Sequence, residues 1–165
     1  MIQRVQTLFL LGVAICMGLV IAYYIWGELI PDQNRVVTFT AFSIDVIDTN
    51  GTIQDKSDDT IVESRSVWYV GALAILSVIT SLVSIFMFKN RLNQMKLGAL
   101  NSLFMVATLG FCYYLINSTE SVFPEVQGST QPGFFLPMAG LLLNMIANRF
   151  IRKDEKLVKS VDRIR

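Results

Sequence analysis

Few side chains in this sequence are of types that catalyse reactions. Histidine, the commonest general base and metal ligand, is absent. Cys16 and Cys112 are single residues in separate apolar segments, whereas a quinone-linked disulfide oxidase needs cysteine pairs. We therefore expect both cysteines to pack as small apolar side chains. The sequence predicts no catalytic residue, no cofactor and no metal site, and hence a protein that is not an enzyme.

Residues 48–53 have the polar composition of the middle of a calcium-binding loop. In that pattern the first ligand would be Val46 and the twelfth Ser57, so both anchoring carboxylates are missing. Asn50-Gly51 instead favours the positive backbone angles of a tight hairpin turn. The acidic residues of segment 55–59 are interpreted first as a solvated turn, and weak binding of a cation is the alternative.

The polar residues inside the apolar segments gather towards one end of each segment. Asn101 lies in the third segment, while Asn144 and Asn148 lie four residues apart, and therefore on one helix face, in the fourth. Hydrogen bonding between helices is the first interpretation of these amides. A polar pocket open to the cytoplasm, or a docking face for another membrane protein, is the alternative. Three further residues at helix ends could meet beside this cluster: Gln3, Arg4 and Arg149.

The elements that must position these residues are four long apolar segments. Hydrophobic residues make up 53% of the chain and charged residues 16%, which is unusual for a soluble domain. Each segment is long enough to cross the hydrocarbon core as a helix. The predicted fold class is an all-α membrane protein, a four-helix transmembrane bundle in one domain, residues 1–165. The spans are expected at about residues 8–27, 67–88, 97–116 and 134–151.

Residues 1–27 also have the plan of a signal peptide, with a short basic start before an apolar run. The run exceeds the usual apolar core of a signal peptide, and no A-x-A-like cleavage site follows it. We therefore expect a retained first span. Tyr23, Tyr24 and Trp26 at its outer end are aromatic residues that prefer the headgroup level of a membrane.

Charge asymmetry orients the spans. Loop 89–96 and tail 152–165 are basic, whereas loops 28–66 and 117–133 are acidic. The N-terminal segment, loop 89–96 and the C-terminal segment together hold eleven basic and three acidic residues. The loops on the other side of the membrane hold three basic and ten acidic residues. Because basic flanks are translocated poorly, the basic side is predicted to be cytoplasmic, with both termini. The tail is expected to be an amphipathic helix.

The first external loop has the pattern of strands. In Val36 to Ile47, Val37, Phe39 and Ala41 share one face, and a change of phase at Phe42 is interpreted as a bulge. We expect a small extracytoplasmic antiparallel hairpin or sheet that caps the helices. This layout is claudin-like by analogy of architecture only, because the paired loop cysteines of claudin-like proteins are missing.

Small residues recur at helical spacing in three of the spans. Small side chains let two helices approach closely, so we expect these positions to pack against a neighbouring helix or a partner. The positions are Ala14, Gly18 and Ala22 in the first span, Ser77 and Ser81 in the second, and Gly140 in the fourth.

The two ends of the chain carry a family resemblance. Met1 to Leu11 (MIQRVQTLFLL) and Phe134 to Arg165 (FFLPMAGLLLNMIANRFIRKDEKLVKSVDRIR) resemble the ends of a family of small four-span integral membrane proteins from Bacteroidota. The family is catalogued as a domain of unknown function. The resemblance is most specific at Ile2-Gln3-Arg4 and in the tail that begins at Ala147. It implies a multi-pass protein of the bacterial inner membrane, and it implies no activity.

These observations favour a non-enzymatic accessory or scaffold subunit of a cell-envelope complex. Its expected partners are the lipid bilayer and either another membrane protein or a second copy of the chain, and not nucleic acid. The alternative is a small transporter or lipid-handling protein built around Asn101, Asn144 and Asn148. No charged residue lies in the middle of a predicted span, which disfavours ion-coupled transport.

Overall fold

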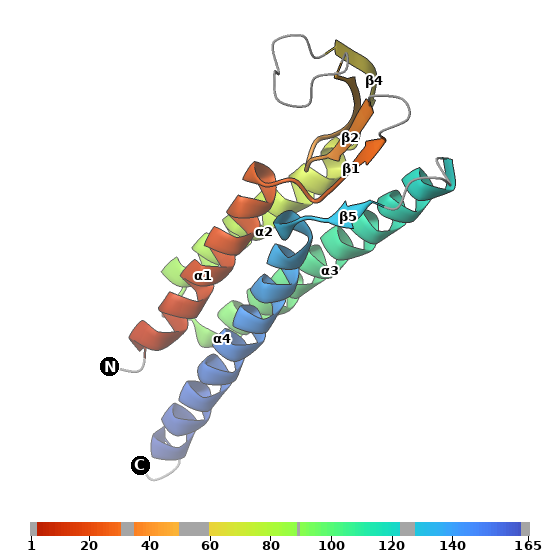
Figure 1. Cartoon of the computed structure of the whole chain (residues 1–165). Coiled ribbons are helices and arrows are strands. Elements are labelled where there is room, and N and C mark those ends of the chain that lie inside the picture. The colour runs from red at the N-terminus through yellow and green to blue at the C-terminus, as the bar shows by residue number, and fades with distance from the viewer. Residues whose placement is uncertain (1–2, 31–34, 50–59, 89, 123–127, 163–165) are drawn as a thin grey trace.

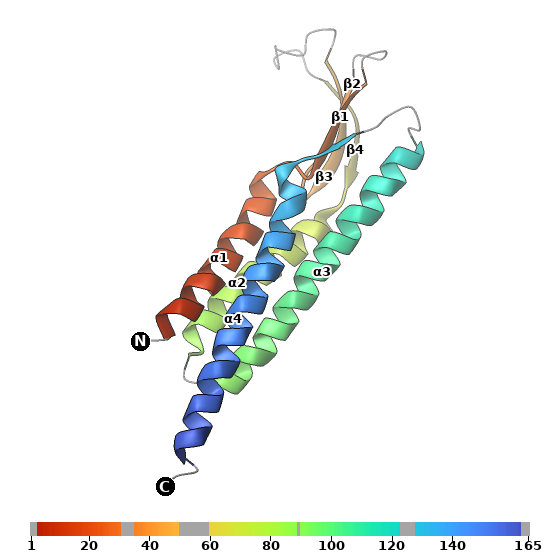
Figure 2. The same cartoon turned by 60° about the horizontal axis from the view of Figure 1, so that its bottom comes forward.

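The computed structural model describes residues 3–30, 35–49, 60–88, 90–122 and 128–162. Four long helices run side by side, and a five-stranded antiparallel sheet stands at one end of them (Figures 1 and 2). The helices are α1 (Gln3–Ala22), α2 (Trp68–Phe86), α3 (Arg91–Val122) and α4 (Pro132–Asp162). The strands are β1 (Trp26–Ile30), β2 (Arg35–Phe39), β3 (Ser43–Asp48), β4 (Thr60–Ser66) and β5 (Ser129–Thr130).

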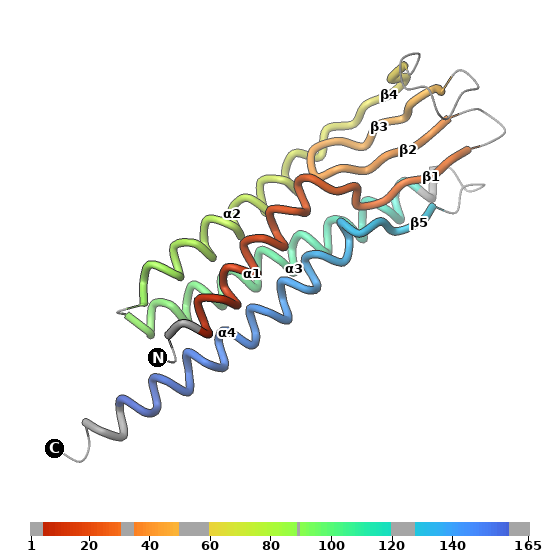
Figure 3. The backbone as a smooth tube through the Cα atoms, turned by 60° about the vertical axis from the view of Figure 1, so that its left-hand side comes forward, coloured from red at the N-terminus to blue at the C-terminus, as the bar shows by residue number. Residues whose placement is uncertain are grey.

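Each of the four helices is long and apolar enough to cross a membrane. They form a closed ring of contacts, in which α1 packs against α2 and α4, and α3 packs against α2 and α4. Helix α1 begins and α4 ends at the end of the bundle opposite the sheet, which we call the terminal end (Figure 1). The other end is called the sheet end, and the strands continue there roughly in the direction of the helices (Figure 3).

One apolar core runs through the sheet end of the bundle and into the sheet. It joins Met17 of α1 and Met105 of α3 with Phe39 and Ile44 of the strands in a single cluster of buried side chains. The inner face of the sheet is therefore part of the helix core. Burial of this face stabilises the sheet, because an isolated antiparallel hairpin is marginally stable in water.

The sheet has the strand order β4-β3-β2-β1-β5. Strands β1 to β4 lie between α1 and α2, where the sequence predicts a sheet. Strand β5 comes from the segment before α4 and pairs Ser129 and Thr130 with Gly27 and Trp26 of β1. The prediction confined the sheet to the first external loop, and this pairing extends it to the second, because a two-residue strand is too short to show a period-two pattern.

The bulge predicted at Phe42 is wrong. The chain reverses between β2 and β3, and the apparent change of phase at Phe42 is this turn. Backbone N–H of Thr40 donates to Ser43 O (2.8 Å), and Ser43 N–H donates to the Thr40 hydroxyl oxygen (3.1 Å). The structure does have a bulge, between Val46 and Ile47 in the register of β3 with β4. The expected Asn50-Gly51 turn and the acidic segment 55–59 lie outside the described residues.

The turn between β2 and β3 attaches the sheet to α2. Val67 N–H donates to Phe42 O and Gly71 N–H donates to Ala41 O, both at 2.8 Å. These are backbone groups at the start of α2, which have no partner within the helix. The Phe42 ring lies against Gly71, where a Cβ would collide with it.

The element boundaries also place Trp26 differently from the prediction. Helix α1 ends at Ala22, and Trp26 begins β1 with only 1% of its surface exposed, so it does not lie at an interface. Pairing of β1 with strands on both sides encloses the indole, and Gly128 leaves the room for it, since a Cβ there would overlap the ring. Tyr23 and Tyr24 are exposed.

Replacing Trp26 tests whether the sheet and the helices share one core. We expect Trp26→Ala to lower the free energy of unfolding by roughly 3–5 kcal/mol, the usual cost of removing a large buried aromatic side chain. Trp68→Ala is the matched control, because Trp68 is 65% exposed and its loss should cost less than about 0.5 kcal/mol. Unfolding of the detergent-solubilised protein, followed by circular dichroism, measures both. Equal losses in the two variants would contradict the shared core.

Candidate functional site

The predicted polar residues of the helices lie in one buried region in the terminal half of the bundle. We call this region the polar seam, and it draws side chains from all four helices. Its buried members carry amides and hydroxyls, which lose much free energy when they are buried without hydrogen bonds. They are Gln6 of α1, Ser77, Ser81 and Ser84 of α2, Gln94 and Asn101 of α3, and Asn144 of α4.

Asn144 joins α4 to α3. Its Nδ2 donates to Gly98 O and to Ser102 Oγ, both at 2.8 Å, and Ser102 donates to Gly98 O (3.1 Å). Asn148, one turn further along α4, lies directly against the Cα of Gly98, where a Cβ would overlap its amide. Glycine at position 98 therefore allows the close approach that brings both amides onto α3.

Asn101 joins α3 to α2 instead. The Ser77 hydroxyl donates to Asn101 Oδ1 (2.5 Å), and two turns nearer the terminal end Gln94 Nε2 donates to Ser84 O (3.0 Å). Asn101 is the chain neighbour of Ser102 but points to a different interface. The three predicted asparagines thus enter one region, in which they divide between two helix pairs.

The remaining interfaces use other contacts. The Ser81 hydroxyl donates to Leu10 O at 2.6 Å, which joins α2 to α1. The Phe9 and Phe150 rings stack with centroids 5.7 Å apart, which joins α1 to α4. At the terminal end an Arg91 N–H donates to Asp154 O (2.7 Å), a second bond between α3 and α4. Every neighbouring pair of helices is therefore connected by a specific contact in this half of the bundle.

Only some of the predicted small-residue positions lie at close contacts between helices. Ala14, Ser77 and Ser81 are buried, and a Cβ on Gly140 would come within 3.0 Å of the Met105 sulfur. Gly18 faces open space, with no atom within 4 Å of an added Cβ, and Ala22 is exposed. On α1 the close approach to α4 is at Gly12 instead, where a Cβ would lie 3.0 Å from a Leu143 methyl.

Sequence reasoning missed several members of the seam. Gly98 and Ser102 are four residues apart, which is the small-residue spacing that marks a close helix contact, and this signal was present. Gln94 and Asn101 are seven apart and share a helix face. Arg149 is exposed and lies outside the seam. The side chains of Gln3 and Arg4 are outside the part of the chain that the structure describes.

The chemistry open to the polar seam is hydrogen bonding. Its side chains carry no group that titrates near neutral pH, so it offers no acid or base. Among the described residues, four amide oxygens are buried without a partner: those of Gln6, Gln94, Asn144 and Asn148. Within the described ranges no cluster of three or more His, Cys, Asp or Glu side chains could hold a metal ion.

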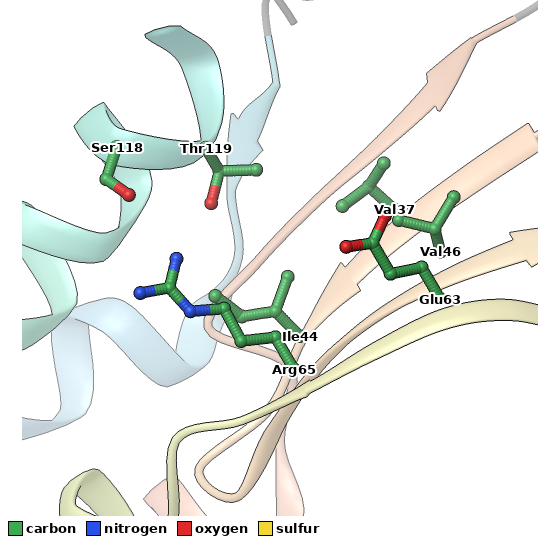
Figure 4. A pocket seen from close by; sticks show the side chains of 7 residues that line it. All are labelled: Val37, Ile44, Val46, Glu63, Arg65, Ser118 and Thr119. Carbon is green, nitrogen blue, oxygen red and sulfur yellow. The ribbon is translucent and has the colours of Figure 1, made fainter. Parts of the chain in front are cut away.

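A recess of about 100 Å³ lies at the sheet end, between the sheet and the last turns of α3. Its floor is apolar, and one cation and one carboxylate stand at its rim. Figure 4 shows the Arg65 guanidinium reaching from β4 towards Ser118 and Thr119 of α3, while Glu63 lies beside Val37. We call it the sheet cleft, and its lining is completed by Ile44 and Val46. It suits one small apolar group with a charged neighbour.

Asn144→Leu tests the bonding role of the polar seam. Loss of the two hydrogen bonds to α3 should lower the free energy of unfolding by about 1–2 kcal/mol. The matched control is Asn117→Leu, because Asn117 is exposed and donates to Tyr113 O of its own helix. Titration with a denaturing detergent, followed by circular dichroism, compares the variants. If Asn144→Leu were as stable as the control, these bonds would not be what holds α4 against α3.

Comparison with known proteins identifies a family of unknown function. No curated protein matches the chain. The family model described as "Domain of unknown function (DUF4293)" matches residues 2–164, which is nearly the whole chain. The match covers the four apolar helices and the sheet described above. The chain belongs to the family described as Domain of unknown function (DUF4293).

Proposed function

We propose that this protein is a non-enzymatic integral membrane protein that serves as an accessory or scaffold subunit of a cell-envelope complex. The observation that carries the proposal is that the buried polar side chains bond one helix to another. Ser77, Ser81 and Asn144 each donate to a group on a neighbouring helix. Polar side chains that could have served chemistry thus take part in helix packing, and this supports a role based on contact surfaces.

Exposed apolar side chains support placement of the bundle in a membrane. Leu8, Phe86 and Leu103 are each more than 60% exposed on the outside of the helices. In water such a surface would be an aggregation hazard, whereas in lipid it costs nothing. The resemblance of the chain ends favours the inner membrane of a bacterium of the Bacteroidota.

The distribution of charge supports an orientation with both termini in the cytoplasm. The helix segments at the terminal end carry Arg91 and Lys96 on α3 and the basic residues of segment 149–156 on α4. The strands at the other end carry more carboxylates than cations among the described residues. Basic segments stay in the cytoplasm, so the sheet is proposed to be extracytoplasmic.

The outer strand β4 and the sheet cleft are the proposed contact surface for a partner. All of β4 is exposed, and Ile61 is 65% exposed, which is unusual for an apolar residue of a strand. The bulge opposite Val46 and the charges of Glu63 and Arg65 discourage addition of a further strand at this edge. A partner would therefore bind through side chains, with an apolar group in the cleft and a carboxylate on Arg65.

A small transporter or lipid-handling protein is the second candidate. The observation that favours it is the set of buried amide oxygens without a partner, which could receive a donor group of a substrate. The variant Asn144→Leu separates the two functions. A packing role requires a loss of stability, whereas a substrate site requires normal stability and a loss of uptake or lipid transfer.

Thiol labelling tests the orientation. In a background without Cys16 and Cys112, Thr60→Cys on β4 and Lys156→Cys on α4 each introduce one exposed thiol. We expect a membrane-impermeant maleimide to label Thr60→Cys in intact spheroplasts and Lys156→Cys only after lysis, because the sheet and the end of α4 lie at opposite ends of the bundle (Figure 1). The reverse pattern would overturn the orientation.

Site-specific photo-crosslinking tests the scaffold role. A photoreactive amino acid at Ile61 should crosslink to one protein species of defined mass, and Arg65→Glu should reduce that yield by reversing the charge at the cleft. The same amino acid at Leu103, which is 62% exposed in the middle of α3, should crosslink to lipid. Crosslinking of Ile61 to lipid or to nothing would count against a partner at the sheet.

A further inference from the structure

The terminal end of α4 presents a row of four cations on one face. Arg149, Arg152, Lys153 and Lys156 are all exposed, and their spacing of three, four and seven residues places them on one side of the helix. They line a surface groove of about 610 Å³ together with Ile146 and Phe150. We call these four residues the basic face.

The four cations of the basic face have no ion-pair partner among the residues that the structure describes. Across the described segments, none of its four residues makes an ion pair or a hydrogen bond. Asp154, next to Lys153 in the sequence, is buried, and its backbone carbonyl accepts from Arg91 of α3. Glu155, next to Lys156 in the sequence, is half-buried and is itself engaged in an interaction. The face therefore has room for a ligand with negative charge.

The groove continues as an apolar surface towards the sheet end. Leu142 and Met145 are 58% and 56% exposed, within about two turns of Arg149 on the same helix. The Phe150 ring is held against Phe9 of α1, so the groove has a rigid aromatic wall. These two surfaces match a ligand that has an anionic head and hydrocarbon chains. The head would lie at the cations, and the chains would lie along Leu142 and Met145.

We propose that the basic face binds the phosphate headgroup of an anionic phospholipid in the leaflet at the terminal end. Arginine can hold a phosphate through two parallel hydrogen bonds, and lysine adds charge at short range. The row from Arg149 to Lys156 is about 10 Å long, which is more than a single ion spans. The inference rests on the membrane placement proposed above, and it is independent of the scaffold role.

Lipid binding to the full chain tests this inference. The purified protein in a neutral detergent is titrated with phosphatidylglycerol or phosphatidylcholine, and bound lipids are counted by native mass spectrometry. We expect the wild type to bind phosphatidylglycerol at least about tenfold more tightly, and Arg149→Gln with Lys153→Gln to lose this preference. The single variants Lys153→Gln and Lys96→Gln each remove one exposed lysine at the terminal end, and only Lys153→Gln should weaken binding.

Further measurements make each outcome decisive. Unfolding curves in lipid-free detergent must agree between the wild type and the double variant, so that a loss of binding is not a loss of fold. An undiminished preference in the folded double variant would overturn the basic face as the site. Displacement of the lipid by millimolar inorganic phosphate would show a free-phosphate site instead and would also overturn the proposal.

The two proposals can fail separately. Insertion of the wild type into phosphatidylcholine nanodiscs, with no preference for phosphatidylglycerol, would overturn the lipid site and leave the membrane placement standing. Failure to insert into nanodiscs of either lipid would overturn the membrane placement and the lipid site together.

Discussion

The close contact of α3 and α4 at Gly98 is the constraint on which the terminal half of the bundle depends. An amide buried among apolar helices must find a partner, and Asn144 finds two on α3 only because Gly98 has no side chain to hold the helices apart. Ser77 and Ser81 of α2 likewise find hydrogen-bond partners on neighbouring helices, Ser77 on α3 and Ser81 on α1. These bonds are directional, so they fix the rotation of each helix as well as its distance from its neighbour, which apolar packing in lipid does poorly.

At the other end the helices and the sheet are one structure. The sheet does not close on itself but lays its inner face on the helix core, with Phe39 and Ile44 in the same cluster as Met17. Backbone bonds from the start of α2 to the turn between β2 and β3 supply partners for helix N–H groups that would otherwise have none. Strand β5 adds a second attachment by pairing with β1 beside Trp26. A scaffold role gains from this arrangement, because a surface on β4 is held rigidly relative to the helices.

The surfaces of the molecule are segregated along its length. Carboxylates and exposed strands lie at the sheet end, apolar side chains surround the middle, and cations gather where α4 ends. Each zone suits a different medium, so the proposed membrane placement, the partner surface on β4 and the lipid site on α4 are mutually consistent. The polar seam is buried inside the bundle, away from these surfaces, and this fits a role in packing.

The sequence by itself determined the four helices, their apolar character and the charge difference between the two ends, because length and composition suffice for these properties. It also indicated that Asn101, Asn144 and Asn148 enter a common region. Only the tertiary structure decided that Asn101 bonds to α2 and Asn144 to α3, since the rotation of a helix that is apolar on all sides is not written in its periodicity. The same holds for Trp26 and β5, whose places depend on pairing between segments far apart in the chain, and long-range pairing leaves no local signal in so short a strand.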